Sequence, residues 1–168
     1  MRTRLVLVLL VALARPSLAQ QPPSIYQRPI EATAVITGSP RLRDGSFQMQ
    51  GVAALCGEIP KERSLTGDAS FVIEIADPPQ GTITTITFGS AQLVGRTTTA
   101  SSFRLSVGVA SPQVGRPPLY VLNTDPPGTK NTGSASLTSA KGVTTLTVAG
   151  VNDANERIQL TATCRPAA

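Results

Sequence analysis

An alternation of apolar and polar residues with a period of two is the feature that most constrains how this chain can fold. The clearest run covers 103–109, where every second residue is apolar: Phe103, Leu105, Val107 and Val109. Such alternation turns one face of a β-strand toward a core and the other toward solvent. The residue spacing of an amphipathic helix is almost absent, so the sequence predicts an all-β protein.

About nine short strands are predicted, separated by clusters of Gly, Pro, Asn, Asp and Ser, which are the residues of turns. They cover residues 31–37, 47–56, 71–75, 82–88, 103–109, 119–122, 134–138, 143–151 and 158–164. This number and spacing favour an antiparallel two-sheet β-sandwich of the immunoglobulin-like kind. A helical turn is predicted at 61–68, and 95–102 is predicted to be an exposed loop that crosses between the sheets. The alternating faces predict these core residues: Phe71, Ile73, Phe103, Leu105, Ile158 and Leu160.

The first nineteen residues have the pattern of a secretory signal peptide. Two arginines precede an apolar run over 5–14, and small residues then predict cleavage between Ala19 and Gln20. The apolar run is about half the length needed to span a bilayer. We therefore expect a secreted or periplasmic protein without a membrane span. A Pro-rich extended lead-in is expected over 20–29, followed by a single β-sandwich domain over 30–168.

The chain has two cysteines, Cys56 and Cys164, which lie more than a hundred residues apart. In an exported chain such a pair predicts a disulfide. Cys164 shares strand parity with Ile158, Leu160 and Ala162, so it is expected on the buried face, where a bridge between two sheets belongs. The chain-entropy account gives roughly 4–5 kcal/mol of stabilisation for a loop of this length. The alternative, a free nucleophilic thiol, would need an activating base, and the chain has no histidine.

The net charge gives no sign of a nucleic acid partner. Three of the fifteen basic residues lie in the predicted signal peptide, which leaves twelve basic residues against ten acidic ones and a mature net charge of +2. The remaining arginines are scattered, and the chain has four Phe, two Tyr and no Trp. Binding to nucleic acid calls for a basic stripe or a stacking platform, so we expect no nucleic acid partner.

The absence of histidine removes the commonest general base and the commonest metal ligand. Hydrolases of the Ser-His-Asp and Cys-His kinds are excluded, and so are zinc sites built from His and Cys. Carboxylate chemistry and calcium binding remain open. The sequence assigns no catalytic residue, no metal ligand and no cofactor, and we do not expect an enzyme.

One polar cluster, Asn152, Asp153, Asn155 and Glu156, could be either a calcium loop or a turn. An EF-hand loop needs glycine at its sixth position and glutamate at its twelfth. Counted from Asp153, these positions hold an isoleucine and a cysteine. Asn and Asp also adopt left-handed backbone conformations and cap nearby backbone groups, as a hairpin before the last strand requires. The cluster is predicted to be a structural turn, with a surface calcium site as the alternative.

Four acidic residues are the candidates for carboxylate catalysis: Glu58, Glu62, Asp68 and Glu74. Glycoside hydrolysis requires two carboxylates about 5–10 Å apart that face one cleft, and nothing in the sequence pairs these residues. With no tryptophan and only Tyr26 and Tyr120, the chain is also poorly supplied with rings on which a sugar could stack.

Four short segments resemble the small secreted lipoprotein-antigen family typified by mycobacterial surface antigens. They are QGVAALC (50–56), GSASLT (133–138), TVAG (147–150) and IQLTATC (158–164), which occur in that order. The resemblance implies a non-catalytic surface or secreted sandwich with roles in adhesion or host recognition, and it carries over no catalytic residue. The chain departs from the family at Gln20, where the family has an acylated cysteine, so a lipid anchor is not expected.

These observations predict an exported, disulfide-bonded and non-catalytic β-sandwich that acts through binding or as a structural surface component. Its partner would be a protein or a surface ligand that the sequence does not identify. Two alternatives stay open. One is a carrier that holds a small apolar ligand between the sheets, and the other is a carboxylate-dependent hydrolase. A carrier should contain an apolar cavity, whereas a binding protein should expose an apolar patch or a sheet edge.

Overall fold

A computed structural model describes residues 25–41, 43–64, 68–75, 79–110, 117–125 and 130–167. The predicted signal peptide and its cleavage site between Ala19 and Gln20 lie outside these ranges. Within them the chain forms eleven strands and one short 3-10 helix, η1 (Lys61–Arg63). The strands are β1 (Tyr26–Thr37), β2 (Gly45–Ile59), β3 (Ser70–Ile75), β4 (Gln80–Gly81), β5 (Ile83–Ser90), β6 (Thr99–Ala100), β7 (Arg104–Val109), β8 (Leu119–Asn123), β9 (Thr132–Ala140), β10 (Val143–Val151) and β11 (Arg157–Cys164).

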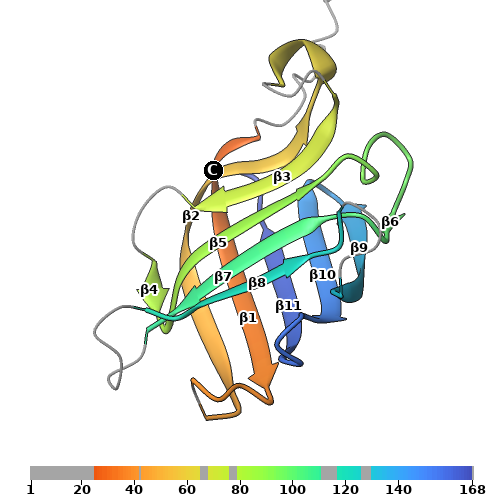
Figure 1. The fold of residues 1–168 in the computed structure, drawn as a ribbon. Helices are drawn as coiled ribbons and strands as arrows, with labels where there is room; N and C mark the ends of the chain where they lie inside the picture. The colour runs from red at the N-terminus through yellow and green to blue at the C-terminus, as the bar shows by residue number, and fades with distance from the viewer. Residues whose placement is uncertain are drawn as a thin grey trace, which may run out of the picture.

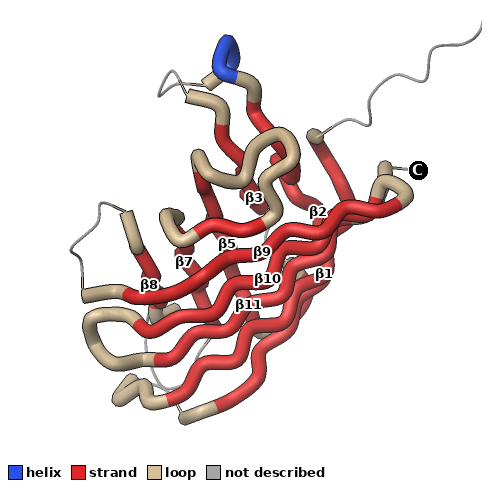
Figure 2. Tube along the Cα trace, turned by 90° about the vertical axis from the view of Figure 1, so that its right-hand side faces the viewer, coloured by secondary structure: helices blue, strands red, loops and turns tan. Residues whose placement is uncertain are grey.

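All eleven strands belong to one antiparallel sheet. Its order is β6-β9-β10-β11-β1-β2-β3-β5-β7-β8, and the short β4 also pairs with β2. Figure 1 shows the sheet curled over itself into a half-barrel, with β3, β5, β7 and β8 lying across β1, β11 and β10. Figure 2 shows the same arrangement from the side, and the core lies between the two layers. No helix in the described ranges has the length and hydrophobicity needed to cross a membrane.

The all-β, antiparallel prediction is confirmed, whereas the two-sheet, immunoglobulin-like arrangement is not. The difference arises in β2, which is fifteen residues long and belongs to both layers. Its first part pairs with β1 and its last part pairs with β3, and the register shifts at a bulge between Ala53 and Leu55. A bulge bends a strand and increases its twist. The strand therefore passes from one layer to the other without breaking the hydrogen-bonded ladder.

The alternating pattern predicted the core correctly. All six predicted core residues are at most 3% exposed: Phe71, Ile73, Phe103, Leu105, Ile158 and Leu160. The ring of Phe88 stacks on Phe103 with centroids 5.8 Å apart, and it meets the edge of Phe71 at 6.3 Å. These aromatic contacts join β3, β5 and the start of β7 on the inner face of the half-barrel.

The predicted crossing loop over 95–102 contains the short strand β6. Thr99 and Ala100 of this strand pair with Ser136 and Ala135 of β9 at the far side of the sheet, although the chain then returns to β7 beside β5. The loop therefore ties the two layers together at one side of the half-barrel. The predicted helical turn over 61–68 is represented by η1, and residues 65–67 lie outside the described ranges.

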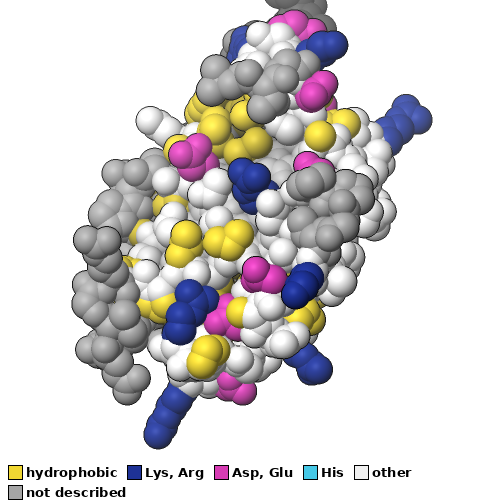
Figure 3. Space-filling view, viewed as in Figure 1, with side chains coloured by type: hydrophobic (Ala, Val, Ile, Leu, Met, Phe, Trp, Pro, Cys, Tyr) yellow, Lys and Arg dark blue, Asp and Glu magenta, His cyan; other side chains and the backbone are white. Residues whose placement is uncertain are grey.

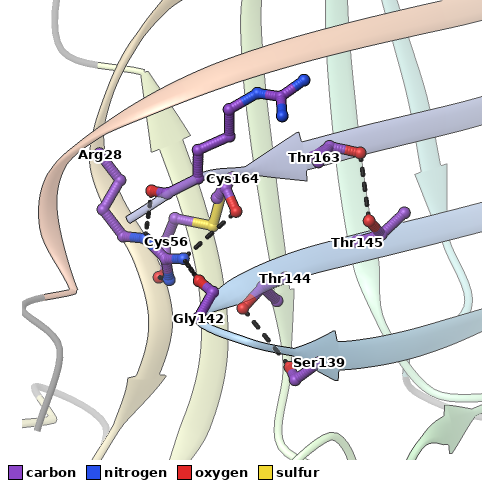
Figure 4. The surroundings of a disulfide bond; sticks show 9 residues. Arg28, Cys56, Ser139, Gly142, Thr144, Thr145, Thr163 and Cys164 are labelled. Carbon is purple, nitrogen blue, oxygen red and sulfur yellow. Dashed lines mark hydrogen bonds between the residues drawn. A yellow bond between two sulfur atoms is a disulfide. The ribbon is translucent and has the colours of Figure 1, made fainter. Parts of the chain in front are cut away.

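The predicted disulfide is present between Cys56 of β2 and Cys164 of β11. The Sγ–Sγ distance is 1.99 Å, the Cα atoms are 6.5 Å apart, and 108 residues separate the two cysteines in the chain. Both residues are fully buried. Because β1 lies between β2 and β11 in the sheet, the bridge links two strands that are not hydrogen-bonded neighbours. It therefore holds three adjacent strands together (Figure 4).

We predict that replacing both cysteines, Cys56→Ala with Cys164→Ala, will lower the free energy of unfolding by about 4 kcal/mol, because the unfolded chain regains the entropy of a long open loop. Urea titration of the variant and of the oxidised wild type measures the difference. Native wild-type protein treated with a mild reductant is the control and should keep its transition, since the bridge is buried. Equal midpoints for the variant and the wild type would contradict the prediction.

Candidate functional site

The four acidic residues considered for carboxylate catalysis lie on separate elements. Glu58 is in β2, Glu62 in η1, Asp68 in the loop before β3 and Glu74 in β3, and all four are exposed. The Glu58 carboxylate accepts a hydrogen bond from the backbone N–H of Gly95 at 2.8 Å. In the part of the chain that the structure describes, no group of three or more His, Cys, Asp or Glu residues could hold a metal ion.

The polar cluster over 152–156 forms the hairpin turn between β10 and β11. The Oδ1 atom of Asn152 accepts hydrogen bonds from the backbone N–H groups of Ala154 and Glu156 at 3.1 and 3.0 Å. Asn155 has a φ of 61°, the left-handed conformation predicted for such a turn. Asn152 and Glu156 point inward and are buried, whereas Asp153 is exposed. Two of the four residues considered as calcium ligands, Asn152 and Glu156, are therefore buried and hydrogen-bonded to each other within the protein.

Glu156 is fully buried and lies at the centre of a hydrogen-bonded group that we call the Glu156 cluster: Ser39, Arg41, Tyr120, Asn152 and Glu156. The carboxylate accepts hydrogen bonds from the Asn152 amide at 2.7 Å and from the Ser39 hydroxyl at 2.9 Å. Arg41 forms an ion pair with it, with Nη2 to Oε2 at 2.9 Å. Sequence reasoning missed this group because its members lie in three separate loops and strands.

The Glu156 cluster joins the edge strand β8 to two hairpins at the opposite layer. Arg41, in the β1–β2 connection, donates a hydrogen bond to the backbone carbonyl of Leu119 at 3.2 Å and lies 4.7 Å from the centroid of the Tyr120 ring. The Tyr120 hydroxyl is 3.2 Å from the Ser39 hydroxyl. One side of the half-barrel is therefore held together by polar contacts in place of a further strand.

The surroundings of Glu156 act on its pKa in two directions. Burial alone raises the pKa, because it disfavours the charged form. Hydrogen bonds from Asn152, Ser39 and Arg41, together with the positive charge of Arg41, lower it, and the net effect is a pKa below the ordinary glutamate value. The folded protein thus prefers the ionised carboxylate.

We predict that the Glu156 cluster makes stability depend on pH. Because the folded pKa is depressed, the stabilisation is fully present above the unfolded glutamate pKa of about 4.3 and is lost as the pH falls through the folded value. Glu156→Gln should therefore be less stable than wild type by roughly 1–3 kcal/mol at neutral pH, and the gap should narrow in acid. Urea titrations from pH 7 to pH 3 test this, with the exposed Glu74→Gln as control. A gap that is constant across that range would contradict the assignment.

Arg28 of β1 is the second buried charged group, and it lies beside the disulfide. It is 4% exposed, and its guanidinium donates to four backbone carbonyls. Nη1 donates to Cys56 at 3.0 Å, Nε to Arg165 at 3.0 Å, and Nη2 to Cys164 at 3.2 Å and also to Gly142 (Figure 4). Burial lowers the pKa of this guanidinium. We call this group, with the bridge, the Arg28 corner.

The acceptors at the Arg28 corner come from β2, from the β9–β10 turn and from the end of β11. The flat, forked guanidinium of Arg28 donates to all of these backbone carbonyls at once. The sequence placed residue 28 in an extended lead-in. The structure instead starts β1 at Tyr26, so this arginine belongs to the sheet.

We predict that Arg28→Ala will lower the free energy of unfolding by roughly 2–4 kcal/mol, because it leaves several buried carbonyls without donors. Arg28→Lys should fall between the alanine variant and wild type, since one ammonium cannot reproduce the forked geometry. Thermal and urea unfolding of wild type, Arg28→Lys and Arg28→Ala measure the order of their stabilities. The exposed Arg104→Ala is the matched control and should be close to wild type. Equal stability of Arg28→Ala and Arg104→Ala would show that the carbonyl contacts do not matter.

The outward face of the sheet over β9, β10, β11, β1, β2 and β4 carries two straight rows of polar side chains. Strand register defines the first row as Thr138, Thr145, Thr163, Glu31, Gln50 and Gln80. The second row, two residues further along each of the five longer strands, is Ser136, Thr147, Thr161, Thr33 and Gln48. We call these the first and second polar rows. Apart from Glu31, every member is a hydroxyl or an amide.

A groove with a volume of about 520 Å³ lies along these rows. Its floor consists of β11, β1 and β2, and Gln80 and Gly81 of β4 form one wall. Gly81 has a φ of 128°, and a Cβ atom there would lie 2.3 Å from the carbonyl oxygen of Gln48. The wall can therefore approach β2 only because position 81 is glycine. Glu31, which also lines the groove, forms an ion pair with Arg165 at 3.0 Å.

A second hollow of about 580 Å³ lies beside β6 and β9 and is lined mainly by Gln92, Thr97, Thr99, Ser101 and Ser134. Both hollows open at the surface, and most of the residues that line them are polar. The carrier alternative called for an apolar cavity between the layers, and neither hollow has that character. The inner face between the layers is filled instead by the buried core, which includes the fully buried ring of Tyr120.

The edge strand β8 supplies the exposed apolar pair that the binding hypothesis anticipated. Leu119 is 47% exposed and Val121 is 40% exposed, and β8 is the last strand in the sheet order. Figure 3 shows that the face on which β3, β5, β7 and β8 lie mixes apolar with charged side chains. Arg41 already donates a hydrogen bond to the Leu119 carbonyl, so this edge is partly covered.

Comparison of the chain with family models, curated proteins and solved structures found no match. The resemblance to the lipoprotein-antigen family stays a prediction. The fold and the surface together define a disulfide-bonded, all-β protein with a curled antiparallel sheet and a grooved polar outer face.

Proposed function

We propose that this chain is an exported, non-catalytic binding protein, secreted or periplasmic, that recognises a surface ligand through its two polar rows. The observation that carries the proposal is the groove of about 520 Å³, whose floor contains the members of both polar rows that lie on β11, β1 and β2. A concave site with several convergent polar groups is the usual form of a recognition site.

The polar rows are rigidly placed, which supports a binding role. They lie on strands paired over their full lengths, and β1 alone pairs with β11 over eight positions and with β2 over ten. The Arg28 corner lies at one end of the same strands, one residue from Thr163. A side chain held on a paired strand loses little entropy on binding, so weak polar contacts can add up.

The hydrolase alternative finds less support in this groove. Glu31 is the one carboxylate among the described residues that line it, and it is already paired with Arg165. Hydrolysis by carboxylates requires two such groups that face each other across a cleft. The carrier alternative finds less support too, because both hollows open at the surface and are lined mostly by polar residues. Binding without chemistry is the function that agrees best with these side chains.

We predict that labelled protein will bind surface material of the cells that produce it and that a bulky charge in the groove will abolish this binding. Gln48→Arg with Thr161→Arg fills the groove from two strands, and both residues are exposed. Thr87→Arg on β5 is the matched control, because it changes an exposed threonine on the other layer of the half-barrel, away from the groove. Co-sedimentation measures binding. Loss with the control variant and retention with the groove variant would place the binding surface elsewhere.

A further inference from the structure

We infer that the groove takes a neutral glycan strand that lies across the β-strands, along the polar rows. This inference rests on the proposed function and specifies its ligand. It is carried by three features of the outer face: the chemistry of its side chains, their spacing and the apolar strip beside them.

The chemistry of the rows matches that of sugar hydroxyls. Thr33, Thr161, Thr163 and Gln48 each offer both a donor and an acceptor, as a sugar hydroxyl does. The charged pair at the end of the groove, Glu31 with Arg165, is internally neutralised at 3.0 Å. An anionic polymer would need a track of cations, and these rows do not supply one. A ligand that is polar and uncharged fits this lining best.

The spacing of the rows suits a polymer with a short repeat. Adjacent strands in a sheet are about 4.8 Å apart, and alternate residues along one strand are about 6.8 Å apart. Each row therefore presents one polar side chain per strand, a hydroxyl or an amide at every position except Glu31, at intervals close to the length of one hexose unit in an extended chain. The pairs Thr33 with Thr161 and Glu31 with Thr163 are directly opposite in the register, so the two rows run parallel across the groove floor.

An apolar strip borders the first polar row. Pro29 of β1 is exposed and lies directly opposite Val52 of β2, which is 39% exposed. Both residues lie two positions beyond the first row on the same outward face. The C–H face of a sugar ring can pack against such aliphatic groups while its hydroxyls reach the rows. This contact partly replaces the aromatic stacking that the chain cannot provide here.

A protein partner fits the same surface less well. Protein interfaces concentrate their binding energy in buried Trp, Tyr and Arg side chains near the centre. The polar side chains that line the groove are threonines, glutamines and Glu31, and no Trp, Tyr or Arg is among the described residues that line it. A ligand held by many small polar contacts is therefore favoured over one held by a few large anchors.

Calorimetric titration of the whole mature protein with short linear oligosaccharides of glucose, mannose, galactose and N-acetylglucosamine tests the inference. We expect at least one of these to bind. The double variant Thr33→Val with Thr161→Val should weaken binding roughly tenfold or more, because it removes two hydroxyls while keeping side-chain shape. Thr87→Val is the matched control and should bind as wild type does. Unfolding curves confirm that both variants fold. If no oligosaccharide binds, or if both variants bind like wild type, the inference is wrong.

A second measurement separates this inference from the proposed function. Surface material is treated either with periodate, which cleaves the vicinal diols of sugars, or with protease, and then tested for binding of wild-type protein. Loss of binding after periodate alone supports the glycan. Loss of binding after protease alone would contradict the glycan inference. In that case, binding by the groove variant, Gln48→Arg with Thr161→Arg, would still test whether the polar rows form the binding surface.

Discussion

The Arg28 corner is the constraint on which the rest of the structure depends. A covalent bridge between β2 and β11 passes across β1, and the guanidinium of Arg28 satisfies carbonyls at the ends of three chain segments. A positive charge without a carboxylate partner is costly to bury, so its four carbonyl acceptors must stay in place. Strands β11, β1 and β2 are thereby aligned at one end, and these are the strands that form the groove floor.

The Glu156 cluster stabilises the half-barrel on the side where β8 is the edge strand. A curled sheet that does not close leaves an edge strand with unpaired backbone groups. Here Arg41 covers the Leu119 carbonyl, and Glu156 holds Arg41 in place from the β10–β11 turn. Strand β6 ties the layers at β9. Between these contacts the half-barrel is closed by side chains and one short strand.

Local patterns predicted much of the fold, and long-range contacts account for what they missed. Alternation over 103–109 and 158–164 indicated the buried faces, and Cys164 was placed on the inner face for the same reason. No local sequence pattern distinguishes two sheets from one curled sheet. The bulge between Ala53 and Leu55 depends on where β1 and β3 pair with β2. Arg28 and Glu156 look like ordinary surface charges in sequence, since most of their partners are more than a hundred residues away. The polar rows emerge only once the strand register is known.

The pairing of β1 with β11 has a consequence for how the protein is made. The earliest and latest described strands are hydrogen-bonded neighbours over eight positions, from Ile30 with Cys164 to Thr37 with Arg157. Such distant pairing is slow to form, because a long loop must close first. The thiol of Cys56 therefore stays without its partner until Cys164 has been synthesised, 108 residues later. During that interval the early strands are held by non-covalent contacts alone.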